Sequence, residues 1–240
     1  MTDYDARLAE VYDSDNPDGP DHDFYRNVAD EVDAASILDI GAGTGILTVS
    51  FARTGRTVVG IDPSATRLDY ARRRAGGDRV TWVRGDSRDA PVGRYDLAVL
   101  TGNVVQHIPD PDWTRTLADI HLKMVPGGVL AFDTRNPGGR AWTTWTSAHP
   151  TERMTPFGML REWSEAEEVT PGHVRLAEHS RFLNSGDTVT DVAMLCFRER
   201  ATIEHQLVAA GFEVDAVYGD WHRTPFTDDA PLMAFVAIAR

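Results

Sequence analysis

Short apolar runs alternate with longer amphipathic segments through the first 133 residues of the chain. Five of the short runs predict strands, at Ser36–Ile40, Thr57–Ile61, Val80–Arg84, Tyr95–Leu100 and Val129–Asp133. The amphipathic segments predict helices, at residues 4–12, 22–34, 45–54, 64–75 and 112–124. Strands that alternate with helices are typical of a parallel, doubly wound sheet.

The pattern changes beyond about residue 158, where polar and apolar residues alternate over long stretches. Three such segments predict an antiparallel insertion, at Met159–Val169, Val174–Asn184 and Thr188–Phe197. They are separated by residues 170–173 and 184–187, which carry the Pro, Gly, Asn and Asp of hairpin turns. A helix at Thr202–Ala210 and strands at Glu213–Tyr218 and Leu232–Ala239 complete the chain. The hairpin-like link between the last two strands indicates one antiparallel strand at the sheet edge.

These elements predict an α/β fold with a doubly wound, seven-stranded sheet whose last strand is antiparallel. A chain of 240 residues is long enough to bury one sizeable core, so we expect a single domain over residues 1–240. Its expected parts are a helical cap (1–35), a ligand-binding core (36–136), an antiparallel three-strand insertion (137–200) and a closing helix with two strands (201–240). The insertion is interpreted as a lid or, because its edge is open, as a homodimer interface.

Charge and composition narrow the classes of partner. A net charge of -13 argues against nucleic acid and against an anionic membrane surface. The polar N-terminus lacks a signal peptide, and no apolar run is long enough to span a bilayer, so a cytoplasmic protein is expected. One cysteine, Cys196, excludes an internal disulfide and any zinc site built on cysteines, and it is expected to be a buried thiol. The eight histidines lack the usual ligand spacing, so no metal is expected.

The strongest local signal is Ile37-Leu38-Asp39-Ile40-Gly41-Ala42-Gly43-Thr44-Gly45, an apolar strand that ends in a glycine-rich turn before a helix. Glycines let a backbone approach a ligand closely, and a helix start offers free N–H groups. The third glycine comes too early for the G-x-G-x-x-G fingerprint of dinucleotide sites. Asp39 would also repel a pyrophosphate but attract an ammonium group. The turn therefore favours a nucleotide-like ligand that carries a cation.

Three further strand ends carry polar residues at the edge of the sheet where ligands bind. They are Asp62-Pro63, Asp86-Ser87 and Thr101-Gly102. Asp62 can accept both hydroxyls of a ribose, whereas Asp86 and the Ser87 N–H can bind an adenine. Carbonyls at Thr101-Gly102 can hold an ammonium group. Each acid alone is explained equally well as a helix cap or turn former. Together they predict a pocket for an adenosine with an amino-acid tail.

These segments, with Tyr95–Leu100 and residues 122–128, resemble the motifs of bacterial, small-molecule class I S-adenosylmethionine-dependent methyltransferases. The resemblance covers roughly residues 36–136 and the last helix and two strands, and it implies a Rossmann-like fold and S-adenosyl-L-methionine as cofactor. It assigns the methionine part to Asp39, Gly41, Ala42, Gly43 and Gly45, the ribose to Asp62 beside Pro63, and the adenine to Asp86 and Ser87. Tyr12 and Tyr25 lie in helices that resemble the cap such enzymes fold over the cofactor. The end of the fourth strand lacks an Asn-Pro-Pro-Tyr motif, which disfavours nucleobase amino groups as acceptors.

The implied reaction is a direct SN2 transfer of a methyl group to a nucleophilic O, N or C of a small molecule. His107 is the candidate general base, although a loop-bracing role is favoured for it. Arg135 and Asn136 follow the fifth strand on the same side and are further candidates; Arg135 or Arg140 can pair with an anionic substrate group. Two alternatives remain: a non-methylating protein that binds S-adenosylmethionine or S-adenosylhomocysteine, and, less favoured, an NAD-dependent dehydrogenase.

Overall fold

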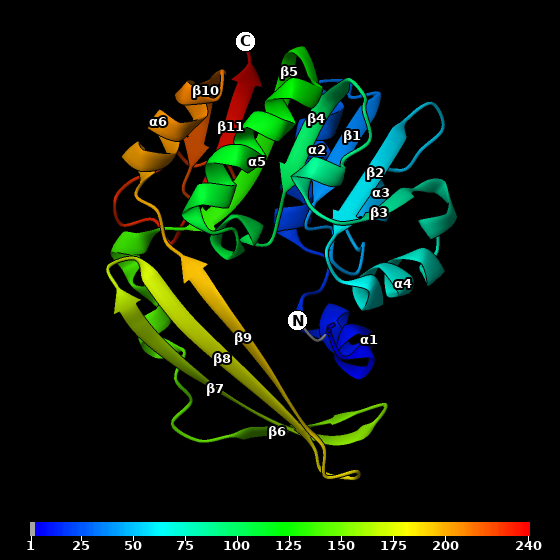
Figure 1. Cartoon of the computed structure of the whole chain (residues 1–240), viewed down its shortest axis with the longest axis vertical. Coiled ribbons are helices and arrows are strands. Elements are labelled where there is room, and N and C mark those ends of the chain that lie inside the picture. Colours follow the sequence, from blue (N-terminus) through cyan, green and yellow to red (C-terminus); the bar gives the residue numbers. More distant parts are fainter. Residues whose placement is uncertain (1–2) are drawn as a thin grey trace.

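The computed structural model describes residues 3–240, which form two separate β-sheets. Figure 1 shows a helix-covered sheet in the upper part of the view and a smaller, projecting sheet below it. The strand order is β10-β11-β5-β4-β1-β2-β3 in the larger sheet and β6-β7-β8-β9 in the smaller one. The predicted α/β, doubly wound seven-stranded fold is therefore confirmed.

The larger sheet is parallel except for one strand. Its strands are β1 (Ser36–Ile40), β2 (Thr57–Asp62), β3 (Thr81–Arg84), β4 (Tyr95–Leu100), β5 (Met124–Arg135), β10 (Phe212–Tyr218) and β11 (Leu232–Ala239). β11 runs antiparallel to both of its neighbours, β5 and β10. The carboxyl ends of β1, β2 and β4 thus lie at one edge, where the predicted site residues follow.

Helices cover both faces of this sheet. The helices of the described residues are α1 (Ala6–Asp15), α2 (Pro20–Glu31), α3 (Thr48–Phe51), α4 (Ala65–Arg73), α5 (Asp110–Lys123) and α6 (Arg200–Ala209), with the short 3-10 turns η1 (Gly77–Arg79), η2 (Ser87–Asp89), η3 (Val104–His107), η4 (Pro137–Gly139) and η5 (Ala141–Thr144). Of these, α1 lies off the edge of the larger sheet and not on one of its faces (Figure 1). One buried hydrophobic cluster packs Trp113 of α5 and Phe132 of β5 against α6. A second buried hydrophobic cluster contains Phe24 of α2 and Phe51 of α3. The helix predicted over residues 45–54 is wrong in length, because Gly45 has a φ of +76° and cannot begin a right-handed helix.

The smaller sheet, called the lid sheet here, contains β6 (Thr151–Thr155), β7 (Gly158–Thr170), β8 (His173–Phe182) and β9 (Thr188–Cys196), all antiparallel. Its last three strands were predicted. β6 was not, because the sequence Thr-Glu-Arg-Met-Thr carries almost no apolar signal. Cys196 is 4% exposed, as expected of a buried thiol. Among residues 3–240, no helix is long and apolar enough to span a bilayer.

Candidate active site

The turn after β1 depends on three glycines in the left-handed region. Gly41, Gly43 and Gly45 have φ values of 80°, 56° and 76°. A Cβ at Gly41 would lie 2.5 Å from a methyl group of Val104, so no side chain fits there. The N–H groups of Gly41 and Ala42 donate to one carbonyl of β2, at 2.8 and 2.9 Å. Those N–H groups are already occupied and α3 has only four residues, so the turn does not form a phosphate cradle.

Asp39 lies under this turn with a carboxylate oxygen that lacks a donor. The residue is 1% exposed, and its Oδ2 accepts a hydrogen bond from the Thr48 hydroxyl at 2.6 Å. Its Oδ1 is buried and has no hydrogen-bond partner among the described residues. Burial raises the pKa of Asp39 to about 7, against the effect of the Thr48 hydrogen bond. A buried carboxylate with one free oxygen is suited to a positively charged donor.

Asp62 ends β2 and fixes the same turn from the other side. Its Oδ2 accepts from the Gly43 N–H and its Oδ1 from the Ser64 N–H, both at 2.9 Å. Burial raises the pKa of this carboxyl, and the neighbouring Arg67 opposes that shift. Asp62 therefore acts as a turn former, which is the role that explains each of these acids equally well when it is taken alone. Each oxygen still has a second lone pair, so ribose hydroxyls can bind as well. Pro63 is exposed at the rim.

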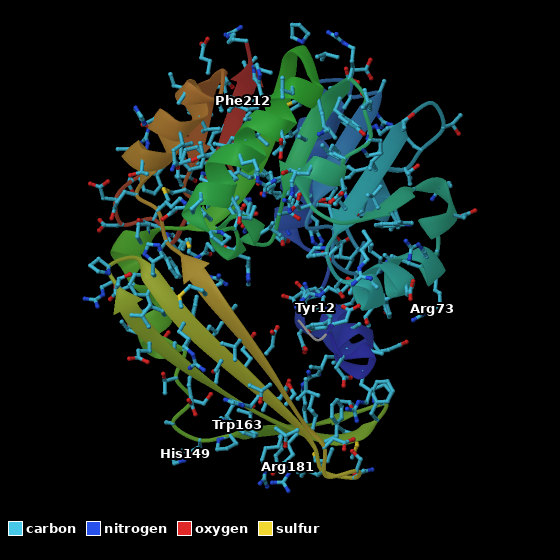
Figure 2. All side chains as sticks on the ribbon, viewed as in Figure 1. Tyr12, Arg73, His149, Trp163, Arg181 and Phe212 are labelled. Atoms are coloured by element: carbon cyan, nitrogen blue, oxygen red, sulfur yellow. The ribbon has the colours of Figure 1, made fainter. Side chains whose placement is uncertain are left out.

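The N-terminal helix α1 is attached to the glycine turn and to α4. The Thr44 hydroxyl of the turn donates to Asp13 of α1 at 2.6 Å. The guanidinium of Arg67 lies 4.1 Å from the ring centroid of Tyr4 and 5.6 Å from that of Tyr12. Figure 2 shows Tyr12 on α1, at the side of that helix that faces the larger sheet. The helix thus lies beside this end of the sheet (Figure 1), and its role as a cap over the cofactor stays a prediction.

Asp133 of β5 organises the end of β4. It is 1% exposed and accepts from the N–H groups of Gly102 and Asn103, at 3.0 and 2.8 Å. The Tyr25 hydroxyl donates to it at 2.6 Å. Burial raises the pKa of Asp133 to about 6 despite these donors. Tyr25 itself has no exposed surface, so any contribution it makes to ligand binding passes through Asp133 and the Thr101-Gly102 strand end.

Charged side chains of the lid sheet face this edge. Glu178 of β8 and Asp191 of β9 are direct cross-strand partners. Burial is the main cause that raises the pKa of Glu178. The negative charge of Asp191 raises this pKa further, and the positive charge of Arg67 lowers it. His107, at the end of η3, keeps some solvent-exposed surface. Burial is the main cause that lowers its pKa; the charge of Arg67 lowers it further, and the charge of Asp191 raises it. His107 and Arg67 of the core therefore lie across from Glu178 and Asp191 of the lid sheet.

Residues 37–128 match the family model described as a methyltransferase domain. The chain therefore carries a methyltransferase domain over residues 37–128. Over 129 residues, it is 35% identical to the ubiquinone biosynthesis O-methyltransferase of Erwinia tasmaniensis. This match covers 51% of each sequence, so the chain spans about half the length of the curated relatives it matches.

Solved methyltransferases share the fold over the whole chain. The CcbJ methyltransferase of Streptomyces caelestis has a TM-score of 0.76 at 20% identity, covering 99% of this chain and 100% of that one. CalS10, an amino pentose methyltransferase of Micromonospora echinaspora solved with S-adenosylmethionine bound, has a TM-score of 0.69 at 21% identity, covering 100% of both chains. At these identities the likeness establishes the fold, lid sheet included. The methyltransferase domain and the S-adenosylmethionine-bound neighbour CalS10 support S-adenosylmethionine as the cofactor.

On the predicted adenine side of the site, Asp86 caps η2. Its Oδ1 accepts from the Arg88 N–H at 2.9 Å, and its own N–H donates to Asp89. The Arg88 side chain pairs with it at 2.6 Å and, as the main cause, lowers the pKa of Asp86 to about 2. The Ser87 hydroxyl is buried and donates to Asp119 at 2.7 Å. An adenine contact from Asp86 remains a prediction and has to compete with Arg88.

Asn136 follows β5 and makes its side-chain contacts with two loops. Its Nδ2 donates to the carbonyls of Asp228 and Ala230, both at 2.8 Å, and its Oδ1 accepts from the Gly138 N–H at 3.0 Å. These contacts use the amide of Asn136 in bracing two loops, and a catalytic role for this residue stays a prediction. Arg135 is different: it is half-buried, donates to the Gln106 side chain at 3.1 Å, and stays available to a ligand.

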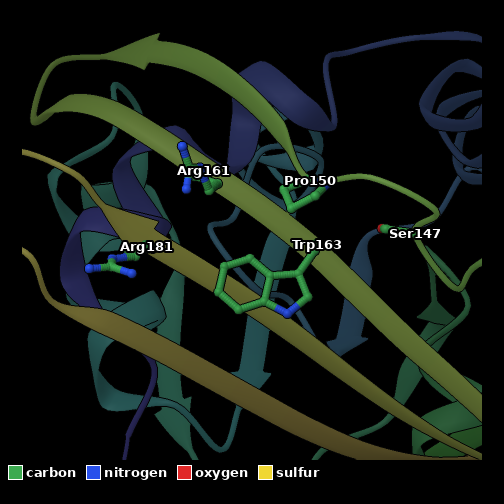
Figure 3. A pocket seen from close by; sticks show the side chains of 5 residues that line it. All are labelled: Ser147, Pro150, Arg161, Trp163 and Arg181. Carbon is green, nitrogen blue, oxygen red and sulfur yellow. The ribbon is translucent and has the colours of Figure 1, made fainter.

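Trp142 and Trp163 have different surroundings in the insertion. Trp142 is buried against Phe197, with ring centroids 4.4 Å apart, so it packs the insertion. The ring of Trp163 stacks on that of its cross-strand partner His179, with centroids 4.8 Å apart. His179 directly follows Glu178 in β8, so these two rings lie on the face of the sheet opposite to Glu178. Figure 3 shows Trp163 beside Arg161 and Arg181 around a shallow pocket of that face. This pocket lies on the side of the lid sheet opposite to the site.

Sequence reasoning missed Asp133, Arg67, Glu178 and Asp191 as site residues. Asp133 follows the same rule as the acids of β1 and β2, since it stands near the carboxyl end of a parallel strand. The lid carboxylates carry no such signal, because alternation shows that two faces exist but does not say which one faces the core.

Proposed function

We propose that this methyltransferase transfers the methyl group of S-adenosylmethionine to a nucleophilic O, N or C of a small molecule. The observation that carries the proposal is the free, buried Oδ1 of Asp39 beneath the glycine turn. In this proposal Asp39, with Gly41, Ala42, Gly43 and Gly45, binds the methionine part. Asp62 and Pro63 bind the ribose, Asp86 and Ser87 the adenine, and Thr101, Gly102 and Tyr12 close the pocket.

The transfer is a direct displacement. The electron pair of the acceptor forms a bond to the methyl carbon while the carbon–sulfur bond breaks, and S-adenosylhomocysteine leaves. The sulfonium already activates the methyl group, so the protein mainly aligns the partners and excludes water. An acceptor that carries a proton passes it to a base. His107 fits this role, because burial and Arg67 lower its pKa and leave the ring neutral near pH 7.

The acceptor is proposed to be small and to carry a hydroxyl or amino group. α1 and the lid sheet flank the site, which limits the size of a ligand. Relatives named for O-methylation and for amino-sugar methylation support both groups as acceptors. Glu178 and Asp191 favour an amine over an anionic acceptor, since two carboxylates face the site from the lid sheet.

The test is a turnover assay with the full chain, S-adenosylmethionine and a panel of amino sugars, simple amines and phenols. Formation of S-adenosylhomocysteine that depends on one acceptor class supports the proposal, and Asp39→Asn is the matched variant with weakened cofactor binding. Tight S-adenosylmethionine binding without turnover on any acceptor, or on a metabolite extract of the source organism, would favour the non-methylating alternative.

The organisation and setting of the chain are further proposals. We infer that residues 1–240 act as one unit, with a cap (1–35), a cofactor-binding core (36–136), an insertion (137–200) and a closing segment (201–240). We also place it in the cytoplasm, without nucleic-acid or membrane partners. The lid sheet ends in β6 and β9, whose outer edges are the surfaces proposed for a homodimer. Light scattering in solution tests the dimer.

A further inference from the structure

Three side chains with metal-binding atoms meet where the lid sheet joins the core. Asp110 is the first residue of α5, His173 begins β8 and Cys196 ends β9. One ligand atom from each lies within 4.8 Å of the other two. His173 and Cys196 are direct cross-strand partners, so the sheet register itself brings the imidazole and the thiol together. This cluster is separate from the proposed cofactor residues.

The contacts of His173 direct Nε2 of its ring at the Asp110 carboxylate. Its Nδ1 lies 3.2 Å from the Pro171 carbonyl, which can only accept, so Nδ1 carries a proton. Its Nε2 lies 3.2 Å from Oδ2 of Asp110, which as a carboxylate also only accepts. A neutral ring would therefore direct its lone pair at a carboxylate. A metal ion bound by both atoms would remove this conflict, and the two atoms are close enough to share one ion.

Neighbouring groups hold the Asp110 carboxylate in place. Arg198 donates from Nε to Oδ1 at 2.8 Å and is anchored by the carbonyls of Val105 and Ile108, at 2.9 and 2.6 Å. The other oxygen of this carboxylate, Oδ2, faces His173. Carboxylates that bind metal ions are commonly held in orientation by hydrogen-bond donors of this kind. The charge of Arg198 opposes a cation nearby, but a carboxylate and a thiolate together supply two negative charges.

We propose that Asp110, His173 and Cys196 bind one zinc-like divalent ion that clamps the lid sheet to α5. Zinc favours a set of sulfur, nitrogen and oxygen ligands, often three from the protein with water as the fourth. The side chains of Asp110 and His173 are 48% and 38% exposed, which leaves a path for the ion and a place for that water. The cysteine count argues only against sites with several thiolates. This proposal does not depend on methyl transfer.

The test uses the full, untagged chain after removal of metal with a chelator. Titration calorimetry with Zn²⁺ is expected to give one equivalent bound, and Co²⁺ is expected to give a sulfur-to-cobalt charge-transfer band. Cys196→Ser and His173→Ala should each weaken Zn²⁺ binding by roughly tenfold or more, and Cys196→Ser should abolish the band. His149→Ala is the matched control, since His149 is exposed and lies before β6 (Figure 2), and it should bind as the parent does.

A clamp also has a structural readout. Zn²⁺ should raise the thermal midpoint of the parent and of His149→Ala but not of His173→Ala. If Cys196→Ser fails to fold by circular dichroism, His173→Ala and Asp110→Asn decide the matter. Absence of stoichiometric Zn²⁺ binding by the parent, or equal affinity in the parent and the folded variants, would overturn the proposal.

Discussion

Replacing Asp39 by Asn should stabilise the protein while weakening cofactor binding. Asn has nearly the same shape, so the change removes the charge and leaves an oxygen that can accept from Thr48. In the free protein the ionised carboxylate is buried with one oxygen lacking a donor, which is unfavourable. With S-adenosylmethionine bound, the same charge would hold the ammonium group.

The magnitude follows from the pKa of Asp39. Burial raises it from 3.8 to about 7, so the folded state holds a proton that the unfolded state has already released in that range. Stability is therefore lost as pH rises from about 4 to about 7, by about 4 kcal/mol in total. The Asn variant escapes this loss. Losing a charged hydrogen bond to the ligand costs about 1.5–3 kcal/mol, or roughly tenfold to a hundredfold in affinity.

The assay combines urea unfolding at about pH 4.5 and about pH 8 with calorimetry of two ligands. Asp39→Asn should exceed the parent in unfolding free energy by up to about 4 kcal/mol at the higher pH, and by much less at the lower pH. It should bind S-adenosylmethionine more weakly but methylthioadenosine, which lacks the amino-acid tail, as the parent does. Asp69→Asn, on the exposed face of α4, is the control for removing a carboxylate.

Two results would refute the reasoning. Equal affinity of Asp39→Asn and the parent for S-adenosylmethionine would remove Asp39 from the ammonium site. A stability difference of the same size at both pH values would show that the Asp39 carboxyl is not titrating between them.

Three further predictions concern other parts of the site. Tyr25→Phe removes a hydrogen-bond donor to the buried Asp133 and should lower the free energy of unfolding by about 1.5–3 kcal/mol near pH 8, measured with urea. The loss should be smaller near pH 5, because Asp133, with a pKa of about 6, is largely protonated there. If His107 is the base, kcat/KM should rise with increasing pH, with a pKa below 6.5, and then level off. His107→Gln should lack that rise, and a variant with the same pH profile as the parent would contradict the role. Gly41→Ala, at φ +80°, should destabilise by about 1–3 kcal/mol in thermal unfolding, whereas Gly139→Ala, with nothing within 4 Å, should have little effect; similar midpoints would disprove the clash.

Much of the fold could be predicted because its signals are local. A run such as Tyr95–Leu100 is apolar at every position but Asp96, as is typical of a strand buried on both faces, and its bounds were predicted correctly. β6 and the length of α3 were not predictable in this way. β6 forms because it pairs with β7, and α3 is short because the glycine turn takes the positions where the helix was expected to begin.

The sequence by itself determined the order of strands and helices, the glycine turn and the acids at the strand ends. These depend on the conformational preferences of neighbouring residues and on the period of the apolar pattern. Only the tertiary structure decided which atoms of those acids remain free: Oδ1 of Asp39 has no donor, whereas Asp86 is capped and paired. It also decided that Glu178 faces the core and that His173 meets Cys196. Hydrogen-bond partners, burial and sheet register arise from segments far apart in the chain, and no local pattern encodes them.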